Sequence, residues 1–499
     1  MTEFLINNMA PIIFAFMVIF MLVGFPVAFA LAANGVVFGL IGIELGLIGP
    51  QIFQALPDRV FGVMSNDTLL AIPFFTFMGL ILERSGMAED LLDTIGQLFG
   101  PLRGGLAFAV IFVGALLAAT TGVVAASVIS MGLISLPIML RYGYDKRLAS
   151  GVIAASGTLA QIIPPSLVLI IMADQLGRSV GDMYKGAFIP GFVLTGLYVG
   201  YVILITLFKP SHAPALPPEA RSLRGAKLML RVLTTLVPPL FLIFLVLGTI
   251  FLGIATPTEG GAMGATGALI MAIMRKRLSW SLLKQAMETT AKLTTFVVFI
   301  LVGARVFSLT FYGVDGHRWV EHLLTDLPGG EIGFLIVTNI LIFFLAFFLD
   351  FFELSFIVVP LLGPVADKLG IDLIWFGVLL AVNMQTSFMH PPFGFALFYL
   401  RSVAPASIKT TDIYWGAIPF VCIQIIMVGL VIMFPQMVTF GLDEDVKVDL
   451  DKVIIEMPDS GYGVPETPPG ISGTPEEGAT TEEDANKAIM ESMKQDAAK

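Results

Sequence analysis

Two predicted membrane spans of this chain, 149–173 and 372–400, each contain a stretch in which the apolar run gives way to polar residues and ends at two consecutive prolines. The first covers residues 155–165 and ends at Pro164-Pro165, and the second covers residues 380–392 and ends at Pro391-Pro392. Proline lacks a backbone donor and clashes with the preceding helical turn, so neither helix continues intact through its proline pair. Inside lipid, the freed backbone groups must face protein or a water-filled cavity. Two such segments in one chain indicate the binding site of a membrane transporter.

The composition also points to a membrane protein. Of the 499 residues, 56% are hydrophobic and 13% are charged, whereas soluble domains carry about 25% charged residues. Apolar runs of about 20 residues suit helices rather than the short, alternating strands of a β-barrel. The sequence therefore predicts an all-α polytopic membrane protein. Because the N-terminus lacks the basic region and cleavage site of a signal peptide, we expect the first apolar run to be a retained span.

We expect about ten transmembrane helices and two re-entrant hairpins. Residues 105–140 and 331–365 form apolar regions of about 35 residues, too short for two crossings, with small or polar residues near the middle. Each region is therefore predicted to enter and leave on one side. The charged but amphipathic segments that precede them, 88–99 and 316–326, are predicted to lie in the membrane interface. The predicted spans are 9–31, 33–50, 69–83, 149–173, 187–208, 232–253, 257–274, 287–311, 372–400 and 416–437.

An internal repeat supports this layout. Residues of the same type recur in the same order at a fixed shift of 227 positions. The matched pairs are Pro101 and Pro328, Pro137 and Pro364, Gly143 and Gly370, Asp145 and Asp372, and the two proline pairs. Five spans precede and five follow a basic, proline-rich loop, so the second half must be inverted relative to the first. We therefore expect inverted repeats at 1–208 and 232–437, joined by a cytoplasmic linker at 209–231.

Charge sets the expected orientation. Outside the predicted spans and before the tail, 16 Lys and Arg residues fall on one side and five on the other, a positive-inside bias that places both termini outside. Residues 438–499 differ from the rest, because after Phe440 the chain has 15 acidic and five basic residues. We expect this acidic tail to be disordered.

Each break, together with the tip of a hairpin, groups oxygen-bearing residues that could hold a dehydrated cation. The candidate ion ligands are Thr120, Thr121, Gly122, Ser156, Gly157 and Thr158 in the first half, and Asp350, Asn383, Gln385, Thr386 and Ser387 in the second. Broken helices also direct their positive N-terminal ends toward the middle of the bilayer, where an anionic group can bind. The alternative is that these small polar residues only allow close helix packing.

Candidate substrate contacts lie at the same breaks. They are Gln161, Pro164, Pro165, Glu353, His390, Pro391 and Pro392. An unpaired carboxylate is costly at membrane depth, so Asp350 and Glu353 bind an ion or proton, lie at a wet mouth of the hairpin, or pair with Arg305. His390 contacts substrate or donates to a freed carbonyl. The sequence leaves these alternatives open.

Enzyme signatures are missing from the sequence. The four histidines form no His-Glu-x-x-His pair, and no Walker A loop is present. We therefore expect no catalytic residue, no organic cofactor and no metal beyond the coupling ion. Uphill transport would then depend on an ion gradient or on an ATPase elsewhere.

Four stretches resemble the large membrane subunit of tripartite ATP-independent periplasmic (TRAP) transporters, the DctM-like family. They are residues 70–79, 143–165, 254–260 and 370–394, which include Ala-Thr-Pro-Thr-Glu and both Pro-Pro pairs. The likeness covers about residues 9–437, and the tail has no counterpart. The first hairpin departs from the pattern, because many members carry a Gly-Ser-Ala-type run with an acidic residue where this chain has Ala-Ala-Thr-Thr-Gly-Val at 118–123.

The resemblance implies a sodium-driven importer of a small organic acid, working by an elevator movement in the bacterial inner membrane. The two hairpins and broken helices would move against the remaining spans. Sodium would bind at Thr120–Gly122 with Ser156–Thr158, and at the second hairpin with Asn383–Ser387. The implied partners are a small four-helix membrane subunit and a periplasmic solute-binding protein, alongside the lipid bilayer and the small-molecule substrate, with no nucleic acid.

Three other functions are weighed against this one. A stand-alone sodium/carboxylate symporter would share the architecture but need no binding protein. An intramembrane enzyme would use Asp350 and Glu353 on a membrane substrate. A membrane scaffold would tolerate changes at Ser156 or Asn383 as long as it assembled.

Overall fold

The computed structural model describes residues 2–442 except 122–123 and 222, and every element in this part is helical. Residues 443–499, most of the predicted tail, lie outside it. The α-helices are α1 (Thr2–Asn7), α2 (Met9–Leu22), α3 (Val27–Glu44), α4 (Leu56–Met64), α5 (Ala71–Arg84), α6 (Met87–Phe99), α7 (Gly105–Thr121), α8 (Val124–Arg141), α9 (Lys146–Thr158), α10 (Leu167–Leu176), α11 (Val180–Phe208), α12 (Ala226–Phe251), α13 (Pro257–Met274), α14 (Trp280–Gly313), α15 (Gly316–Thr325), α16 (Gly330–Leu345), α17 (Phe351–Glu353), α18 (Val359–Lys368), α19 (Leu373–Ser387), α20 (Phe395–Val403), α21 (Thr410–Met433) and α22 (Gln436–Thr439).

Both predicted interruptions are present. α9 ends at Thr158 and is followed by one 3-10 turn, η3 (Leu159–Gln161), before α10 begins at Leu167. α19 ends at Ser387, and α20 begins only at Phe395. Each gap contains its Pro-Pro pair, as expected where proline removes a helical donor.

The two halves contain corresponding elements about 227 residues apart. α8 spans 124–141, and the continuous helical stretch of α17, a π-helical turn η6 (Leu354–Val358) and α18 spans 351–368. Asp145 and Asp372 cap α9 and α19, with their carboxylates accepting backbone N–H groups at 3.0 and 2.7 Å. Gly143 and Gly370 both have positive φ, 82° and 78°, a conformation that suits glycine before such a cap. The inversion of one half relative to the other stays a prediction.

The N-terminal region differs from the expected spans 9–31 and 33–50. α2 ends at Leu22, and α3 begins at Val27 with Pro26 at its N-cap. The predicted first span, 9–31, is therefore interrupted between two helices. Proline at position 26 also keeps Phe25 out of helical geometry, a signal hidden by the uniformly apolar sequence. A further helix, α4, occupies a stretch that the prediction left as a loop.

Helix length and composition are consistent with a multi-pass membrane protein. Six helices in the described part are long and apolar enough to cross a membrane: α3, α8, α11, α12, α14 and α21. Two bent pairs raise this to eight, and one of them joins α15 to α16 at 116°. Several interrupted or shorter apolar helices, such as α10 and α19, fall below this length, so the expected number of ten stays a prediction.

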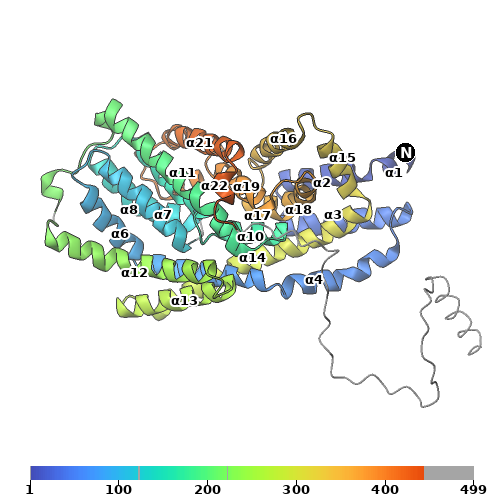
Figure 1. Cartoon of the computed structure of the whole chain (residues 1–499), viewed down its shortest axis with the longest axis horizontal. Helices are drawn as coiled ribbons and strands as arrows, with labels where there is room; N and C mark the ends of the chain where they lie inside the picture. Colours follow the sequence, from blue (N-terminus) through green and yellow to red (C-terminus); the bar gives the residue numbers. More distant parts are fainter. Residues whose placement is uncertain (1, 122–123, 222, 443–499) are drawn as a thin grey trace, which may run out of the picture. The chain divides into compact units, whose positions relative to one another are not determined.

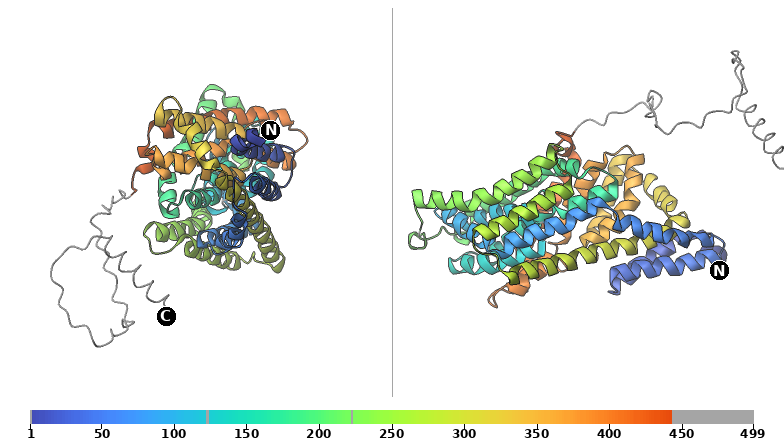
Figure 2. Two further views of the ribbon diagram at one scale, coloured as in Figure 1. Left: turned by 90° about the vertical axis from the view of Figure 1, so that its right-hand side faces the viewer. Right: turned by 90° about the horizontal axis from the view of Figure 1, so that it is seen from below.

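Long helices form one layer of the described part, and the interrupted helices lie beside it. In Figure 1, α6, α7, α8 and α11 lie toward one end, α15, α16 and α18 toward the other, and α10, α17 and α19 between them. Figure 2 shows long helices side by side in one layer, where α14 packs on α3 and α5, and α13 packs on α5 and α12. The interrupted helices therefore lie in the middle of the described part.

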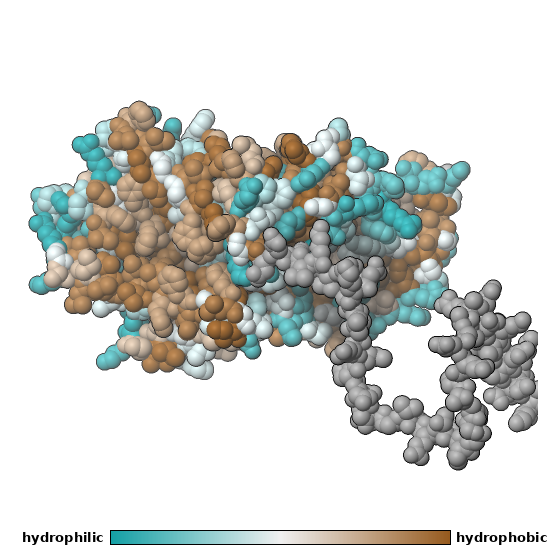
Figure 3. Space-filling view, viewed as in Figure 1, coloured by the Kyte–Doolittle hydropathy of each residue, from teal (hydrophilic) through white to brown (hydrophobic). Residues whose placement is uncertain are grey.

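Apolar side chains cover much of the surface. Figure 3 shows broad hydrophobic areas on one face of the protein. The large exposed apolar side chains include Phe192 and Phe208 on α11 and Phe241 and Phe244 on α12, which are 56–80% exposed. Apolar area on this scale is unusual for a soluble monomer and typical of a surface in contact with lipid.

Candidate functional site

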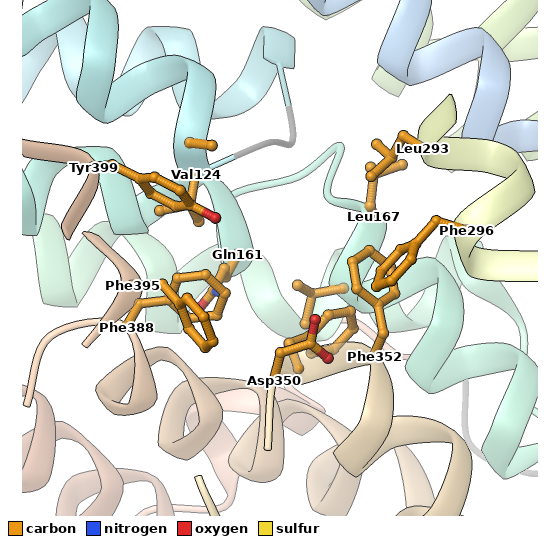
Figure 4. Close-up of a pocket in the computed structure, with 13 residues that line it drawn as sticks. Val124, Gln161, Leu167, Leu293, Phe296, Asp350, Phe352, Phe388, Phe395 and Tyr399 are labelled. Atoms are coloured by element: carbon orange, nitrogen blue, oxygen red, sulfur yellow. The ribbon is translucent and has the colours of Figure 1, made fainter. Parts of the chain in front are cut away.

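A cavity of about 260 Å³ is lined by residues at both helix breaks and by residues of both segments that were predicted as hairpins, 105–140 and 331–365. Figure 4 shows side chains from several helices pointing into it, with the Asp350 carboxylate between the Phe388–Phe395 side and the Phe352–Phe296 side. The lining residues are Val124, Ala125, Gln161, Leu167, Val168, Leu293, Phe296, Asp350, Phe351, Phe352, Phe388, Phe395 and Tyr399. We refer to this space as the central cavity.

The two halves contribute equivalent positions to the central cavity. Four pairs of lining residues are separated by 227 positions: Val124 and Phe351, Ala125 and Phe352, Gln161 and Phe388, and Val168 and Phe395. The first half supplies aliphatic and amide side chains at these positions, and the second half supplies only phenylalanine. The wall from the first half is therefore built of aliphatic and amide side chains, which we call the thin wall, and the wall from the second half is aromatic. The cavity is asymmetric although its backbone elements correspond.

Helix N-termini surround this cavity. α8 begins at Val124, α10 at Leu167 and α20 at Phe395, and all three residues line it. Ser166 caps α10, with its hydroxyl accepting the backbone N–H of Val168 at 3.2 Å. The partial positive charge of helix N-termini favours a negatively charged group near them.

Asp350 and Glu353 cap each other. The Asp350 carboxylate accepts the backbone N–H of Glu353 at 3.0 Å, and the Glu353 carboxylate accepts that of Asp350 at 2.9 Å. Neither forms an ion pair with Arg305 among the described residues, so the structure does not contain that alternative. Asp350 lines the central cavity, whereas Glu353, a predicted substrate contact, is not among its lining residues.

A buried hydrogen-bond network joins the two predicted clusters. The side-chain amide of Gln385 donates to the Thr158 hydroxyl at 3.1 Å, and these residues are themselves 227 positions apart. Gln424 on α21 donates to the Tyr198 hydroxyl on α11 at 2.9 Å and approaches Thr158 at 3.4 Å. The two helix breaks are therefore in direct contact.

Ser156 and Gly157 lie where α9 approaches the first hairpin. A Cβ on Gly114 of α7 would lie 2.5 Å from the Ser156 Cβ, and a Cβ on Gly157 would collide with Val128 of α8. Glycine at these positions therefore permits close helix contact. Gly122 lies outside the described residues, and for Thr120 and Thr121 the structure describes only the helical backbone at the end of α7.

The second predicted ion cluster is divided. The Asn383 side-chain amide donates to the backbone oxygen of Asn339 at 2.8 Å and to its side-chain oxygen at 3.0 Å. These two asparagines line a separate cavity of about 240 Å³. The segment predicted as the second hairpin therefore contacts Asn383 through Asn339 of α16. Thr386 and Ser387 donate to backbone oxygens of their own helix at 2.7 and 2.5 Å.

Several candidate oxygens are buried without a hydrogen-bond partner in the described part of the chain. They are Ser156 Oγ, Gln161 Oε1 and Gln385 Oε1. Gln424 Oε1, which was not a predicted ligand, is also buried without a partner there. Buried polar atoms are almost always satisfied by protein, water or an ion. Neutral side-chain oxygens are also suitable ligands for a small hard cation. The residues present therefore fit bound Na⁺ or ordered water.

His390 and the prolines complete the breaks. The His390 ring stacks on Phe347 with centroids 3.9 Å apart and meets Phe343 edge-on at 5.2 Å. Both ring nitrogens are buried without a partner among the described residues, so His390 does not donate to a freed carbonyl. Pro391 and Pro392, like Pro164 and Pro165, lie in the gaps between helices, and none of the four lines the central cavity.

Sequence reasoning missed Asn339, Gln424 and Tyr198. Asn339 and Gln424 each interrupt an apolar run within a helix, a signal that polar residues inside a membrane helix commonly carry. Tyr198 lies in the long apolar α11 and could not be distinguished from an interfacial aromatic. Only the packing of α21 against α9, with α11 packed on α21, shows their relation to Thr158.

Similarity to known proteins agrees with this geometry. The family model of the tripartite ATP-independent periplasmic transporter, DctM component, matches residues 14–437. The C4-dicarboxylate TRAP transporter large permease protein DctM of Pseudomonas aeruginosa is 29% identical over 391 residues, which are 78% of this chain and 89% of that protein. The protein of the same description from Vibrio cholerae is 29% identical over 86% of this chain and 96% of its own length.

The fold also resembles a solved transporter structure. The YdaH transporter of Alcanivorax borkumensis has a TM-score of 0.55 and 16% sequence identity, covering 77% of this chain and 88% of that one. The relatives are permeases, in line with a transporter rather than an enzyme. With the family match over nearly the whole chain, this protein belongs to the DctM family of TRAP transporter large permeases and is a multi-pass protein of the bacterial inner membrane.

Proposed function

We propose that this permease imports a small organic acid, driven by a sodium gradient, and that the central cavity holds the acid. The observation that carries the proposal is the convergence of helix N-termini on a cavity built by both breaks and both hairpins. These N-termini attract a carboxylate, and the Phe351, Phe388 and Phe395 side chains provide an apolar surface for the carbon skeleton. The C4-dicarboxylate descriptions of the two relatives fit a ligand of this class.

Sodium coupling is supported by the unpartnered oxygens beside the cavity. Ser156, Thr158 and Gln385 are fully buried, and water or a cation must satisfy the free oxygens of Ser156 and Gln385. A bound cation there would add positive charge near the central cavity and so strengthen carboxylate binding. Ion and substrate affinity would then be linked, which is the requirement for symport.

We also propose that the predicted hairpins and the interrupted helices move against the layer of long helices in an elevator movement. Ser130 of α8 donates to Glu83 of α5 at 2.8 Å, and Asn66 donates to Asp174 of α10 at 2.6 Å. An elevator movement would have to break both hydrogen bonds. Two further components, a small membrane subunit and a periplasmic solute-binding protein, are proposed from the tripartite family description.

Reconstitution tests the proposal directly. Purified full-length protein, with its small membrane subunit, is placed in proteoliposomes, and uptake of radiolabelled succinate, pyruvate and sialic acid is measured with and without an inward sodium gradient. We expect uptake of at least one acid that requires sodium and the matching binding protein.

Two results would contradict it in different ways. Sodium-dependent uptake without a binding protein would favour the stand-alone sodium/carboxylate symporter. Uptake that is unchanged when potassium replaces sodium would exclude sodium coupling. A matched variant, Gln385→Glu, keeps the length of the side chain while altering its charge, and is expected to shift the sodium concentration for half-maximal uptake.

A further inference from the structure

A second cavity, of about 330 Å³, contains two arginines. Its polar lining includes Arg59 of α4, Gln175 of α10, and Arg305, Ser308 and Tyr312 of α14. We call it the arginine cavity. Among the described residues, neither Arg59 nor Arg305 takes part in an ion pair or side-chain hydrogen bond that would neutralise it.

The position of Arg305 makes this lack of a partner costly. It lies inside α14, eight residues before the helix ends at Gly313, and only part of its surface is exposed. Ionisable residues within membrane helices generally pair with an opposite charge or face a water-filled pathway. Asp350 and Glu353 cap each other instead, and Asp174, next to Gln175, is held by Asn66 and Gln175 at 2.6 and 2.7 Å.

The same three segments line both cavities. On α14, Phe296 faces the central cavity and Arg305 the arginine cavity, about 14 Å apart along the helix axis. On the helical stretch 351–368, Phe352 lines the first and Phe356 the second. α10 likewise contributes its beginning to one cavity and Gln175 to the other. The two spaces therefore follow one another along a single three-helix interface.

We propose that the arginine cavity is a separate binding site for small carboxylates, at the external end of the route to the central cavity. Two guanidinium groups suit a carboxylate in geometry and charge. The positive-inside pattern assigns Arg59 to the external side, and α14 ends on that side in the same orientation. Carboxylate binding stands on the cavity alone, whereas its role before transport rests on the proposed function.

A cysteine reporter tests the site locally. In full-length protein carrying Cys422→Ser, which removes its one native cysteine, Ser308→Cys is labelled in nanodiscs with an anionic and a cationic methanethiosulfonate reagent. We expect the anionic reagent to react faster. Adding Arg305→Gln should lower the anionic-to-cationic rate ratio about fivefold or more, while Arg305→Lys keeps most of it. Arg318→Gln, on α15 outside the cavity, is the matched control and should leave the ratio unchanged.

Protection identifies the ligand class. Acetate, succinate or pyruvate in excess should slow labelling by the anionic reagent at constant ionic strength, whereas chloride should not, and Arg305→Gln should remove the protection. Gln161→Leu, a central-cavity variant, should leave protection unchanged. A ratio insensitive to Arg305→Gln, protection by none of the acids, or protection lost in Gln161→Leu would each overturn the proposal. Absent sodium-driven uptake with intact protection would instead refute only the proposed function.

Discussion

The break between α9 and α10 and the break between α19 and α20 meet at the same cavity with different side chains. In the first half, α9 packs closely on its hairpin through Gly157, and Val124 and Ala125 form a thin wall. In the second half, the position equivalent to Gly157 is Met384, whose sulfur accepts from Ser355 of the hairpin at 3.8 Å. Phenylalanines fill the equivalent wall positions.

This difference shows how a repeated backbone acquires an asymmetric site. The first half achieves hairpin contact by removing side-chain volume, whereas the second half fills the same interface with flexible or aromatic groups. Methionine and aromatic side chains adapt to changes in shape more readily than glycine contacts do. We therefore expect the first interface to be rigid and the second to yield when substrate binds.

The largest effect should follow from placing bulk on the thin wall. Ala125→Trp would fill much of the central cavity and lower organic-acid uptake about 100-fold, because even small misplacement of a bound substrate has effects of this size. Phe352→Trp, at the equivalent position on the aromatic wall, should cost much less. Leu133→Trp on the exposed side of α8 is the control. Equal losses of uptake in Ala125→Trp and Phe352→Trp would show that the two walls do not differ in function.

Truncating Met384, which fills the contact between α19 and the helical stretch 351–368, should reduce the stability of the protein. Met384 is fully buried, so Met384→Ala leaves a cavity that costs about 2–5 kcal/mol in the free energy of unfolding. The measurement is reversible unfolding in detergent micelles. Met384→Leu, which nearly conserves volume, should cost less than about 1.5 kcal/mol. Similar losses in both variants would indicate that the methionine is not a packing element.

The reverse change tests the first interface. Gly157→Ala adds one methyl group against Val128 and should cost about 1–3 kcal/mol, because a packed contact of this kind cannot yield without moving α8. Gly200→Ala on α11, where a Cβ would meet nothing within 4 Å, is the matched control and should be neutral or stabilising. A neutral Gly157→Ala would show that the first hairpin is not rigidly held.

The helix caps should behave alike in both halves. Asp145→Ala and Asp372→Ala each remove a carboxylate that accepts N-terminal backbone N–H groups, and each should cost about 1 kcal/mol. Thermal unfolding of the two variants side by side measures the difference. If only one variant lost stability, the two halves would differ in how their helices are capped as well as in the side chains at the cavity.

The smallest effect concerns the hydrogen bond that joins the halves. A double-mutant cycle of Gln385→Leu and Thr158→Val should give a coupling of about 0.6 kcal/mol, the average for hydrogen bonds inside membranes. A coupling several times larger would indicate that Gln424 and Tyr198 act cooperatively with this pair. Coupling near zero would mean that the contact is incidental.

Local chemistry made the helix breaks predictable. Pro164-Pro165 and Pro391-Pro392 follow polar residues and lie in gaps between helices, where proline can supply no helical donor. A proline pair alone is not enough, because Pro238-Pro239 lies inside the continuous helix α12. Asp145 and Asp372 were visible only as a matched pair of the repeat, and the structure shows that each caps a helix. By contrast, Pro26 was overlooked because it lies in an apolar run that reads as one continuous span.

The sequence by itself determined the class of protein, the two interrupted helices and the correspondence between the halves, because hydropathy, proline and capping act over a few residues. Only the tertiary structure decided which side chains meet. In the folded protein, Gln385 donates to Thr158, and Gln424 donates to Tyr198 beside them. Asn383 donates to Asn339, and Asp350 is bonded to Glu353 rather than to Arg305. Such contacts depend on how helices distant in the chain pack together, and a single sequence contains no local signal for that packing.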